Sequence, residues 1–445
     1  MKKLQENKYY HIITYGCQMN EHDSEKLAGM LEDMNYKYTD ELKDADIILL
    51  NTCIIRENAE LKVFGKLGEL KKYKRENPNL IIGVGGCMMQ QDAPVDEIYK
   101  KYRHVDLIFG THNIHHLPDL IKKIEDNRER VVEVWDEEEG LIPDLPSKRE
   151  SEHSAWISII QGCNNFCTYC IVPYVRGRER SRPLDSIVEE AERLAEEGVK
   201  EITLLGQNVN SYGNDLEDEI DFPLLLEELN KVDKLKRIRF MTSHPRDFSE
   251  SLLDKIKNLE KVAKHIHLPV QSGSNKVLKE MNRGYTREYY LETVKNIQEE
   301  IPEAAVSTDF IVGFPGESEE DFEDTIELVK ELRFDMAYTF IYSPRSGTPA
   351  SRREDQVPDK TKKERLNRLM ELQNKISYEK NQELVGRKQK ILVTGPSSSD
   401  EEVYQGRTEG NKICFIDKAP ELVGEVVEVK IDSAKSWTLD GTVIE

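Results

Sequence analysis

The stretch Gly162-Cys163-Asn164-Asn165-Phe166-Cys167-Thr168-Tyr169-Cys170 decides how this chain of 445 residues is organised. Its three thiols have the spacing C-x-x-x-C-x-x-C and follow directly after the apolar run 155–160. Three thiolates can bind three irons of a [4Fe-4S] cluster and leave the fourth iron open for a substrate or cofactor. A closed zinc site usually takes four protein ligands from paired C-x-x-C units, and no second pair lies nearby. We therefore interpret the loop as an iron-sulfur site rather than as a zinc site or three core cysteines.

Apolar runs alternate with amphipathic helical patterns from this loop onward. A repeated strand and helix order predicts a barrel or partial barrel whose site lies in the loops after the strands. Those loops are polar here, although each one taken alone is typical of an ordinary turn. The expected strands cover 155–160, 201–205, 237–241, 265–270, 305–312 and 336–342, and the polar loops cover 206–210, 242–245, 271–274 and 313–317.

Three more cysteines, Cys17, Cys53 and Cys87, lie close to the ends of three successive apolar runs in the first part of the chain. Each run is followed by a helical pattern, which predicts an α/β domain with a parallel sheet. The carboxyl ends of such strands share one edge, so the three thiols are expected to converge there. Converging thiolates predict a second cluster with one free iron. The alternative is three unrelated buried cysteines, a common residue type in cores.

Composition and texture divide the chain into segments. A charged, proline-containing stretch without periodicity predicts a linker over 127–150. Short alternating strands separated by glycine, proline and serine turns predict a small β-barrel at the end of the chain. The expected α/β architecture thus has a Rossmann-like domain at 8–126, a central domain at 151–381 and an all-β domain at 382–445.

The charge and hydropathy of the chain limit its partners and location. The sequence has 38% hydrophobic residues and no apolar run of transmembrane length, and its polar start lacks a signal-peptide core. Seven cysteines suit metal binding in a reducing compartment, so we expect a cytoplasmic protein without a membrane partner. The net charge of -21 opposes indiscriminate nucleic-acid binding, so any RNA contact must be local.

An arginine run directly after the cysteine loop is one candidate for such a contact. Bidentate hydrogen bonds from its guanidinium groups would suit RNA phosphates. The alternative is that these arginines pair with the glutamates around them. The run consists of Arg176, Arg178, Arg180 and Arg182.

The cysteine loop followed by alternating strands and helices resembles the radical S-adenosylmethionine (SAM) superfamily. With a three-cysteine domain before it, the chain is similar to the methylthiotransferases, and within them to the bacterial branch that acts on isopentenyladenosine in tRNA. The similarity covers essentially the whole chain. Its finer stretches are 51–57, 62–68, 164–173 and 206–213, with small departures at Ile54-Ile55 and Ser351-Arg352-Arg353.

This resemblance implies a tRNA methylthiotransferase with two [4Fe-4S] clusters and two molecules of SAM. Its product would carry a methylthio group on carbon 2 of isopentenyladenosine at tRNA position 37, in the anticodon loop. That carbon bears an unactivated C-H bond, so a cofactor must supply a radical. The resemblance also implies a central partial (β/α)6 barrel, a C-terminal OB-like TRAM domain that docks RNA, an electron donor of flavodoxin type and a monomeric chain.

The resemblance also assigns roles to individual residues. The cluster of Cys163, Cys167 and Cys170 would bind SAM and cleave it to a radical, and the cluster of Cys17, Cys53 and Cys87 would carry the sulfur. Gln207 and Asn208 would lie near the methionine part of SAM, Gln271 and Ser272 near the ribose, and Ile311 and Gly313 beside the adenine. In the TRAM domain, RNA binding would need a local face around Arg387, Lys388, Arg407 and Lys412.

Two other interpretations stay open. A methylthiotransferase acting on threonylcarbamoyl-adenosine or on a ribosomal-protein aspartate shares the same domains, although the Asn164-Asn165-Phe166 loop resembles the isopentenyladenosine branch. A non-catalytic iron-sulfur redox sensor that binds RNA belongs to another class. Such a sensor would form no deoxyadenosine when incubated anaerobically with SAM and dithionite.

Overall fold

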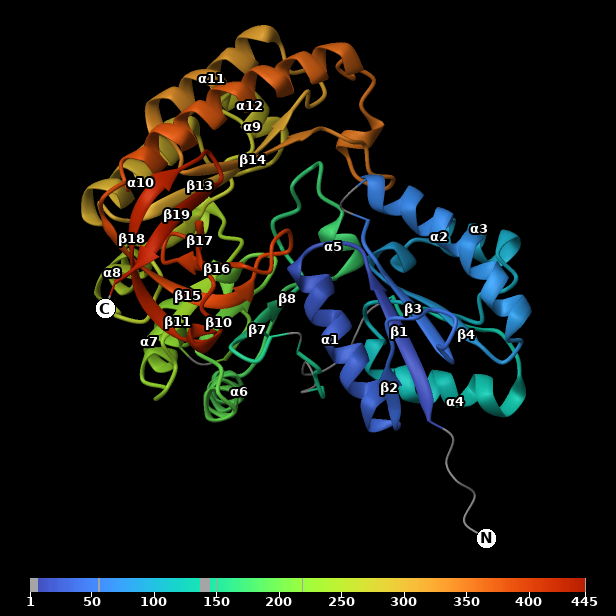
Figure 1. Cartoon of the computed structure of the whole chain (residues 1–445). Helices are drawn as coiled ribbons and strands as arrows, with labels where there is room; N and C mark the ends of the chain where they lie inside the picture. The colour runs from blue at the N-terminus through green and yellow to red at the C-terminus, as the bar shows by residue number, and fades with distance from the viewer. Residues whose placement is uncertain (1–6, 55–56, 137–144, 150, 218, 445) are drawn as a thin grey trace. The chain divides into compact units, whose positions relative to one another are not determined.

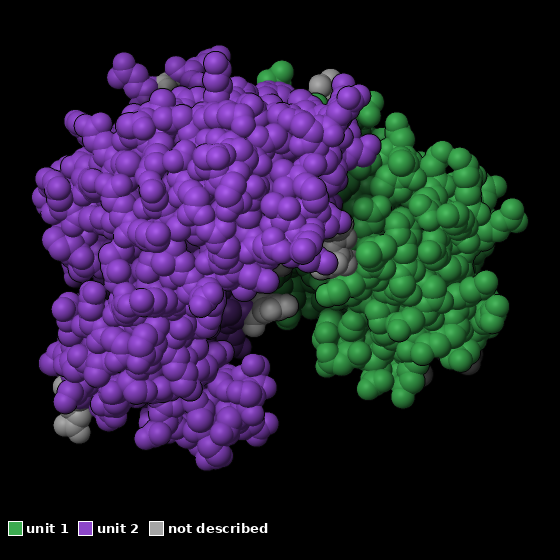
Figure 2. All heavy atoms as spheres, turned by 90° about the horizontal axis from the view of Figure 1, so that it is seen from above, with its two compact units in different colours: residues 1–150, 161–164, 171–180 green, residues 151–160, 165–170, 181–445 purple. Residues whose placement is uncertain are grey.

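The computed structural model describes residues 7–54, 57–136, 145–149, 151–217 and 219–444, with the side chains of 57–59 left aside. Ile55 and Arg56 of the resembling stretch and a large part of the expected linker lie outside these residues. The chain divides into two compact units (Figure 2). Unit 1 comprises residues 1–150, 161–164 and 171–180, and unit 2 comprises residues 151–160, 165–170 and 181–445.

Unit 1 is built on one parallel sheet with the strand order β2-β1-β3-β4-β5-β6. Figure 1 labels β1, β2, β3 and β4 of this sheet. Its two central strands, β3 (Ile47–Thr52) and β4 (Ile81–Gly86), are buried along their whole length, as expected for a sheet covered on both faces. The other strands are β1 (Lys8–Thr14), β2 (Tyr36–Tyr38), β5 (Leu107–Phe109) and β6 (Val131–Glu133). The helices are α1 (Gln18–Asp33), α2 (Glu57–Glu76), α3 (Asp92–Lys101) and α4 (Leu117–Asn127), with short 3-10 turns at Cys87–Gln90 and Ile114–His116.

Two strands of this sheet differ from the sequence-based expectation. β2 and β6 have three residues each and pair with β1 and β5 at the two edges of the sheet. Three residues are too few to show an alternating pattern, so only pairing with a neighbour defines them. Because β6 lies within the expected linker 127–150, this part of the linker belongs to the sheet.

Unit 2 begins with six parallel strands that alternate with helices. They form two three-stranded sheets, β7-β10-β11 and β12-β13-β14, and a bridge between Ile238 and Val262 links β11 to the segment before β12. The strands are β7 (Ser154–Ser158), β10 (Glu201–Leu205), β11 (Arg237–Phe240), β12 (His265–His267), β13 (Ala305–Val312) and β14 (Met336–Ile341). The helices are α6 (Leu184–Glu196), α7 (Phe222–Asn230), α8 (Glu250–Asn258), α9 (Asn275–Glu280), α10 (Arg287–Glu300), α11 (Glu319–Leu332) and α12 (Asp359–Gln382). This arrangement confirms the predicted partial (β/α)6 barrel.

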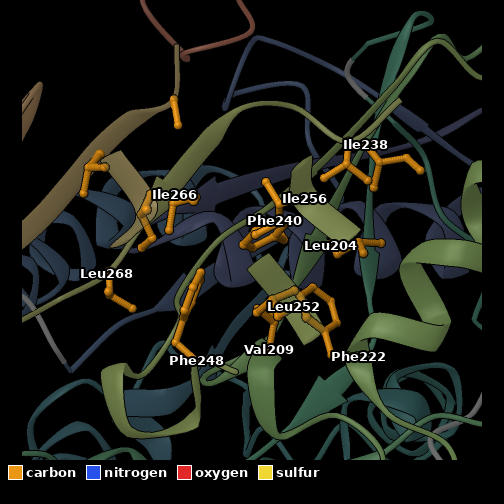
Figure 3. Packing of buried hydrophobic residues seen from close by; sticks show 14 of the residues in the cluster. Leu204, Val209, Phe222, Ile238, Phe240, Phe248, Leu252, Ile256, Ile266 and Leu268 are labelled. Carbon is orange, nitrogen blue, oxygen red and sulfur yellow. The ribbon is translucent and has the colours of Figure 1, made fainter. Parts of the chain in front are cut away.

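Apolar side chains of these strands and helices form the largest core (Figure 3). Phe240 of β11 and Phe222 of α7 meet edge to face, with ring centroids 5.3 Å apart. Leu204 of β10 and Leu252 of α8 belong to the same buried cluster. We call this partial (β/α)6 barrel the half barrel. Helices cover one face of its strands, and the other face is turned toward the interior of the barrel.

The end of the chain forms a closed five-stranded barrel in the order β15-β16-β17-β19-β18. Its strands are β15 (Lys388–Pro396), β16 (Val403–Thr408), β17 (Ile413–Asp417), β18 (Val426–Ala434) and β19 (Thr438–Val443). The predicted small all-β domain is thus confirmed. In the part of the chain that the structure describes, no helix combines the length and apolar character needed to cross a membrane.

Candidate active site

The three cysteines of unit 1 lie at the carboxyl ends of three neighbouring strands. Cys17 is the N-terminal cap of α1 directly after β1, Cys53 follows β3, and Cys87 opens the 3-10 turn after β4. A Cβ atom added to Gly16 would lie 2.9 Å from the Cβ of Cys53, so Cys17 and Cys53 belong to adjacent loops. The structure therefore brings the strand ends that carry these thiols to one edge of the sheet.

Arg176 accompanies this edge. Its Nε lies 3.3 Å from the Sγ of Cys87, and its Nη2 donates a hydrogen bond of 2.7 Å to Asp23 of α1. Burial raises the pKa of the Cys87 thiol to about 12, the positive charge of Arg176 opposes this rise, and the charges of Cys53 and Cys17 add to it. Without a metal the thiol of Cys87 keeps its proton, so metal binding here would release one.

The first part of the central cysteine loop is held by residues 177–179, which lie within the segment of the arginine run. Gly162 has φ +77°, and a Cβ atom on it would collide with the carbonyl oxygen of Arg178. The amide of Cys163 donates to the carbonyl of Gly177 at 3.2 Å, and Asn164 bonds to the carboxylate of Glu179. A glycine is required at 162 because only it combines this φ with this close approach.

The second part of the loop is tied to the end of α9 in unit 2. Thr168 donates from its amide to the carbonyl of Met281 at 3.0 Å and from its hydroxyl to the carbonyl of Glu280 at 2.8 Å. Arg283 lies behind the buried Cys167, with Nη1 3.3 Å from Sγ. These contacts hold the backbone next to Cys167 and place an arginine N-H beside its sulfur.

The metal-binding role of the six cysteines stays a prediction. Among the described residues, no three His, Cys, Asp or Glu side chains are arranged so that they could hold a metal ion. The donor chemistry nevertheless fits an iron-sulfur cluster, because all predicted ligands are soft thiols and one cysteine in each trio has an arginine N-H beside its sulfur.

Four of the residues predicted to contact SAM lie on the loop after β12 and at the end of β13 with the loop that follows it. Gln271, at φ +75°, donates from its amide to the carbonyl of Asp309 at 2.8 Å and accepts from the amide of Ile311 at 2.9 Å. The hydroxyl of the buried Ser272 accepts from the amide of Ser274. Gly313 has φ +72°, and a Cβ atom on it would collide with the side chain of Lys362. Hydrogen bonds at Gln271 and a close approach at Gly313 therefore fix the backbone conformation at these two positions.

Gln207 and Asn208 lie on the loop after β10, among buried polar atoms that no described residue satisfies. Nδ2 of Asn208 donates to Asp247 at 2.7 Å, but Oδ1 of Asn208 and Oε1 of Gln207 have no partner in the described part of the chain. The atoms in the same situation on the neighbouring loops and strand ends are Oγ of Ser158, both side-chain polar atoms of Asn210, Oγ of Ser243 and Nε2 of His244. Buried polar groups are nearly always paired, so this group fits a polar ligand at the carboxyl ends of β7, β10 and β11.

His244 is a site residue that the sequence did not single out within its polar loop. Burial, with the positive charges of Arg283 and Arg246, lowers its pKa to about 2, so the imidazole is neutral. Its Nδ1 accepts from the amide of Arg246 at 3.3 Å, which places the hydrogen on Nε2. His244 therefore presents a buried donor to the same region as Asn208. Only its burial in the fold identifies it.

Two members of the arginine run do not fit the predicted role in phosphate binding. Arg176 is buried against Asp23, and Arg182 is buried with Nη1 2.5 Å from Glu190. For these two residues the expectation of phosphate contacts is corrected, since acidic side chains already neutralise their charge in the interior. Arg178 is exposed, and the half-buried Arg180 contacts Gln161 at 3.3 Å, so both stay candidates.

The basic residues of the C-terminal barrel also divide into two kinds. Arg387, Lys388 and Arg407 are exposed, with Lys388 3.2 Å from Glu428. The ammonium group of Lys412 instead lies 2.8 Å from Asp335 and bonds to Asn381. Lys412 therefore does not belong to an exposed RNA-binding face.

Comparisons with known families agree with this architecture. The model of the Radical SAM superfamily matches residues 157–329, that of the uncharacterized protein family UPF0004 matches residues 9–110, and that of the TRAM domain matches residues 382–444. The radical SAM methyltransferase TsrM from Kitasatospora setae has a similar fold, with a TM-score of 0.57 at 15% identity, covering 78% of this chain and 77% of that one. Fold and cysteine loop thus place the chain in the class of radical SAM proteins.

Curated relatives narrow the class. A tRNA-2-methylthio-N(6)-dimethylallyladenosine synthase from Thermoanaerobacter pseudethanolicus is 54% identical over 99% of this chain and 93% of its own length. The synthase of the same name from Acetivibrio thermocellus is 52% identical over 99% of this chain and 92% of its own length. The chain belongs to the family of the tRNA-2-methylthio-N(6)-dimethylallyladenosine synthases.

Proposed function

We propose that this chain is a radical SAM tRNA methylthiotransferase that places a methylthio group on carbon 2 of isopentenyladenosine, also called N(6)-dimethylallyladenosine, at tRNA position 37. The observation that carries this proposal is the 54% identity over nearly the full length to a synthase of that name. The cysteine trios and the unsatisfied polar atoms at the strand ends support the same chemistry.

Two [4Fe-4S] clusters and SAM are the cofactors in this proposal. Cys163, Cys167 and Cys170 hold the cluster that binds SAM, and Cys17, Cys53 and Cys87 hold the second cluster. When bound, these groups supply the radical and the sulfur, which no side chain can provide. The protein itself holds and orients: Gly162 and Thr168 fix the cysteine loop, and the arginines beside Cys87 and Cys167 stabilise negatively charged sulfur.

SAM is held in this proposal by the loops at the carboxyl ends of the strands. Gln207 and Asn208 face its methionine part, Gln271 and Ser272 its ribose, and Ile311 with Gly313 its adenine. The neutral Nε2-H of His244 adds a donor for a carboxylate or hydroxyl oxygen in the same region. Because most of these groups are buried and Gln271 and Asn208 are already held by hydrogen bonds, ligand binding costs little reorganisation.

The remaining partners follow from the substrate. An adenosine in an anticodon loop is unpaired and can enter a pocket at modest cost. We propose that Arg178, Arg180, Arg387 and Lys388 contact the phosphates of this tRNA, with the TRAM domain at 382–445 binding RNA. A flavodoxin-type electron donor, a monomeric chain and a cytoplasmic location complete the proposal, together with domain limits at 8–126 and 151–381.

The decisive experiment is mass spectrometry of tRNA nucleosides from a strain that lacks this gene, with and without a plasmid copy. The expected result is isopentenyladenosine without its methylthio group in the deletion strain and restoration by the plasmid. An unaltered nucleoside profile would show that tRNA is not the substrate. Loss of methylthio-threonylcarbamoyl-adenosine instead would show that threonylcarbamoyl-adenosine is the substrate. Anaerobic reconstitution is expected to yield about eight irons per chain, as two cubane clusters require.

A further inference from the structure

Two large aromatic side chains are exposed on strand β14. Tyr338 and Phe340 are 41% and 47% exposed, although β14 belongs to the largest core of the molecule. They alternate with Ala337 and Ile341, which pack against that core. Since successive side chains of a strand point to opposite faces, Tyr338 and Phe340 share the face turned away from the helices, about 7 Å apart along the strand.

That face is the inner face of the half barrel, at its open side. β14 is the last strand of its sheet and pairs only with β13 in the described part of the chain, with Asp309 opposite Tyr338 and Ile311 opposite Phe340. The ring of His267 meets the ring of Tyr338 edge to face at 5.8 Å. His267 is itself held by Ser307, 3.0 Å from Nδ1, so Tyr338 packs against a fixed neighbour while part of its surface stays accessible.

The C-terminal barrel contributes an exposed cation, Arg407 of β16. Burial raises the pKa of the Tyr338 phenol, and the positive charge of Arg407 on β16 opposes the rise. The side chain of Arg407 is exposed, but its backbone is fixed, because its carbonyl accepts a hydrogen bond of 2.9 Å from the buried Arg237 of β11. Two accessible aromatic side chains and an exposed arginine match the chemistry that binds unpaired nucleotides.

We propose that Tyr338 and Phe340 form a stacking shelf for unpaired bases that flank the target nucleotide of the substrate RNA, with Arg407 of the C-terminal barrel contacting a phosphate of the same RNA. This inference rests on the proposed function for the presence of an RNA substrate. It adds residues from the edge strand of the half barrel to the RNA contacts. The shelf distinguishes looped from paired RNA, because bases in a duplex offer no free face to an aromatic ring.

The test is fluorescence anisotropy with the anaerobically reconstituted full-length protein and a labelled anticodon stem-loop carrying isopentenyladenosine. Tyr338→Ala and Phe340→Ala should each weaken binding by about 5- to 150-fold, the range for loss of one base stacking contact. Tyr338→Phe keeps the ring and should stay within about threefold of the parent protein. Arg407→Gln should reduce the salt dependence of log Kd by about 0.7, the slope for one phosphate of a single strand.

The matched control is Tyr378→Ala, which removes an equally exposed aromatic (47%) from helix α12 and should leave affinity unchanged. Unchanged affinity in both Tyr338→Ala and Phe340→Ala while the parent protein binds the stem-loop would overturn the shelf and leave the proposed function standing. Failure of the parent protein to bind the stem-loop would remove the function and the shelf together. A change of oligomeric state in the alanine variants, without a change in RNA affinity, would assign the aromatic face to self-association and also overturn the proposal.

Discussion

At the scale of single residues, the two predicted clusters share one feature, an arginine beside the sulfur of one cysteine. Arg176 approaches Cys87 and Arg283 approaches Cys167, each with a nitrogen 3.3 Å from sulfur. A buried guanidinium keeps its charge at every accessible pH, so it can stabilise negatively charged sulfur without titrating itself. Neither arginine could be assigned from its neighbours in sequence, because each pairs with a cysteine more than eighty residues away.

Mutations in the two trios of cysteines should affect different steps of the reaction. We expect Cys53→Ala or Cys17→Ala to keep reductive cleavage of SAM to deoxyadenosine but to lose the methylthio product, whereas Cys167→Ala loses both. Chromatography of the deoxyadenosine and the tRNA nucleosides measures the two outputs. Cys414→Ala, in the interior of the C-terminal barrel, is the matched control and should keep both. Abundant deoxyadenosine together with a normal methylthio product from Cys53→Ala would refute this division.

His265 predicts a pH dependence of stability. Burial, with the charge of Arg239, lowers its pKa to about 3, against about 6.5 in an unfolded chain. Below pH 6.5 the unfolded state therefore takes up a proton that the folded state does not. The free energy of unfolding consequently decreases as the pH is lowered. Between pH 7 and pH 5 this one group accounts for a loss of about 2 kcal/mol.

The comparison is urea unfolding of the parent protein and of His265→Asn at pH 7 and pH 5. The variant should lose about 2 kcal/mol less over this interval, because it lacks the titrating group. Equal losses in the two proteins would show that His265 is protonated in the folded state as readily as in the unfolded one.

At the scale of elements, the loops after the strands are specified by backbone geometry as much as by side chains. Gly162, Gln271 and Gly313 all have positive φ where a predicted ligand site begins. Local glycine spacing was visible in the sequence, but the partner that requires the glycine was not. For Gly162 that partner is the carbonyl of Arg178, sixteen residues later.

Gly162→Ala should therefore be much more damaging than a glycine replacement that only strains the backbone. The added methyl group collides with a carbonyl, so the cysteine loop must shift; we expect incomplete iron loading and a loss of stability above about 1 kcal/mol. Gly198→Ala is the control, because Gly198 has φ +104° with open space around it. Iron content and melting temperature of the two variants measure the difference. Equal iron content in both would show that the loop adapts to the methyl group.

At the scale of the whole molecule, the C-terminal barrel is attached to the half barrel of unit 2 by buried charge. Arg239 of β11 donates to the carbonyls of Thr408 and Glu409 and, through Nε, to Glu201 at 2.9 Å. Arg237 reaches two further barrel carbonyls. Asp335, next to β14, pairs with Lys412 of the C-terminal barrel and with Lys380 of α12 at 2.8 Å each. The proposed RNA shelf depends on this attachment, because it fixes Arg407.

Removal of Arg239 tests the attachment. Arg239→Ala leaves two carbonyls and part of the charge of Glu201 unsatisfied, and breaking such a buried pair costs about 3 to 5 kcal/mol. We expect faster amide hydrogen exchange in 388–396 and 403–409 and weaker binding of RNA. Arg333→Ala breaks an exposed pair with Glu379 and should cost less than about 1 kcal/mol. Unchanged exchange in Arg239→Ala would show that apolar contacts alone hold the barrel.

The sequence by itself determined the order of strands and helices, the division into an α/β, a (β/α) barrel and an all-β segment, and the placement of two cysteine trios after strands. These features depend on residues that are neighbours in the chain, through periodicity, turns and spacing. The tertiary structure alone decided the short edge strands β2 and β6, the closure of the barrel by β19 between β17 and β18, and the burial of Arg176, Arg182 and Lys412. Each of these depends on a partner that folding brings close, such as Asp23, 153 residues from Arg176, and local sequence carries no record of such a distance.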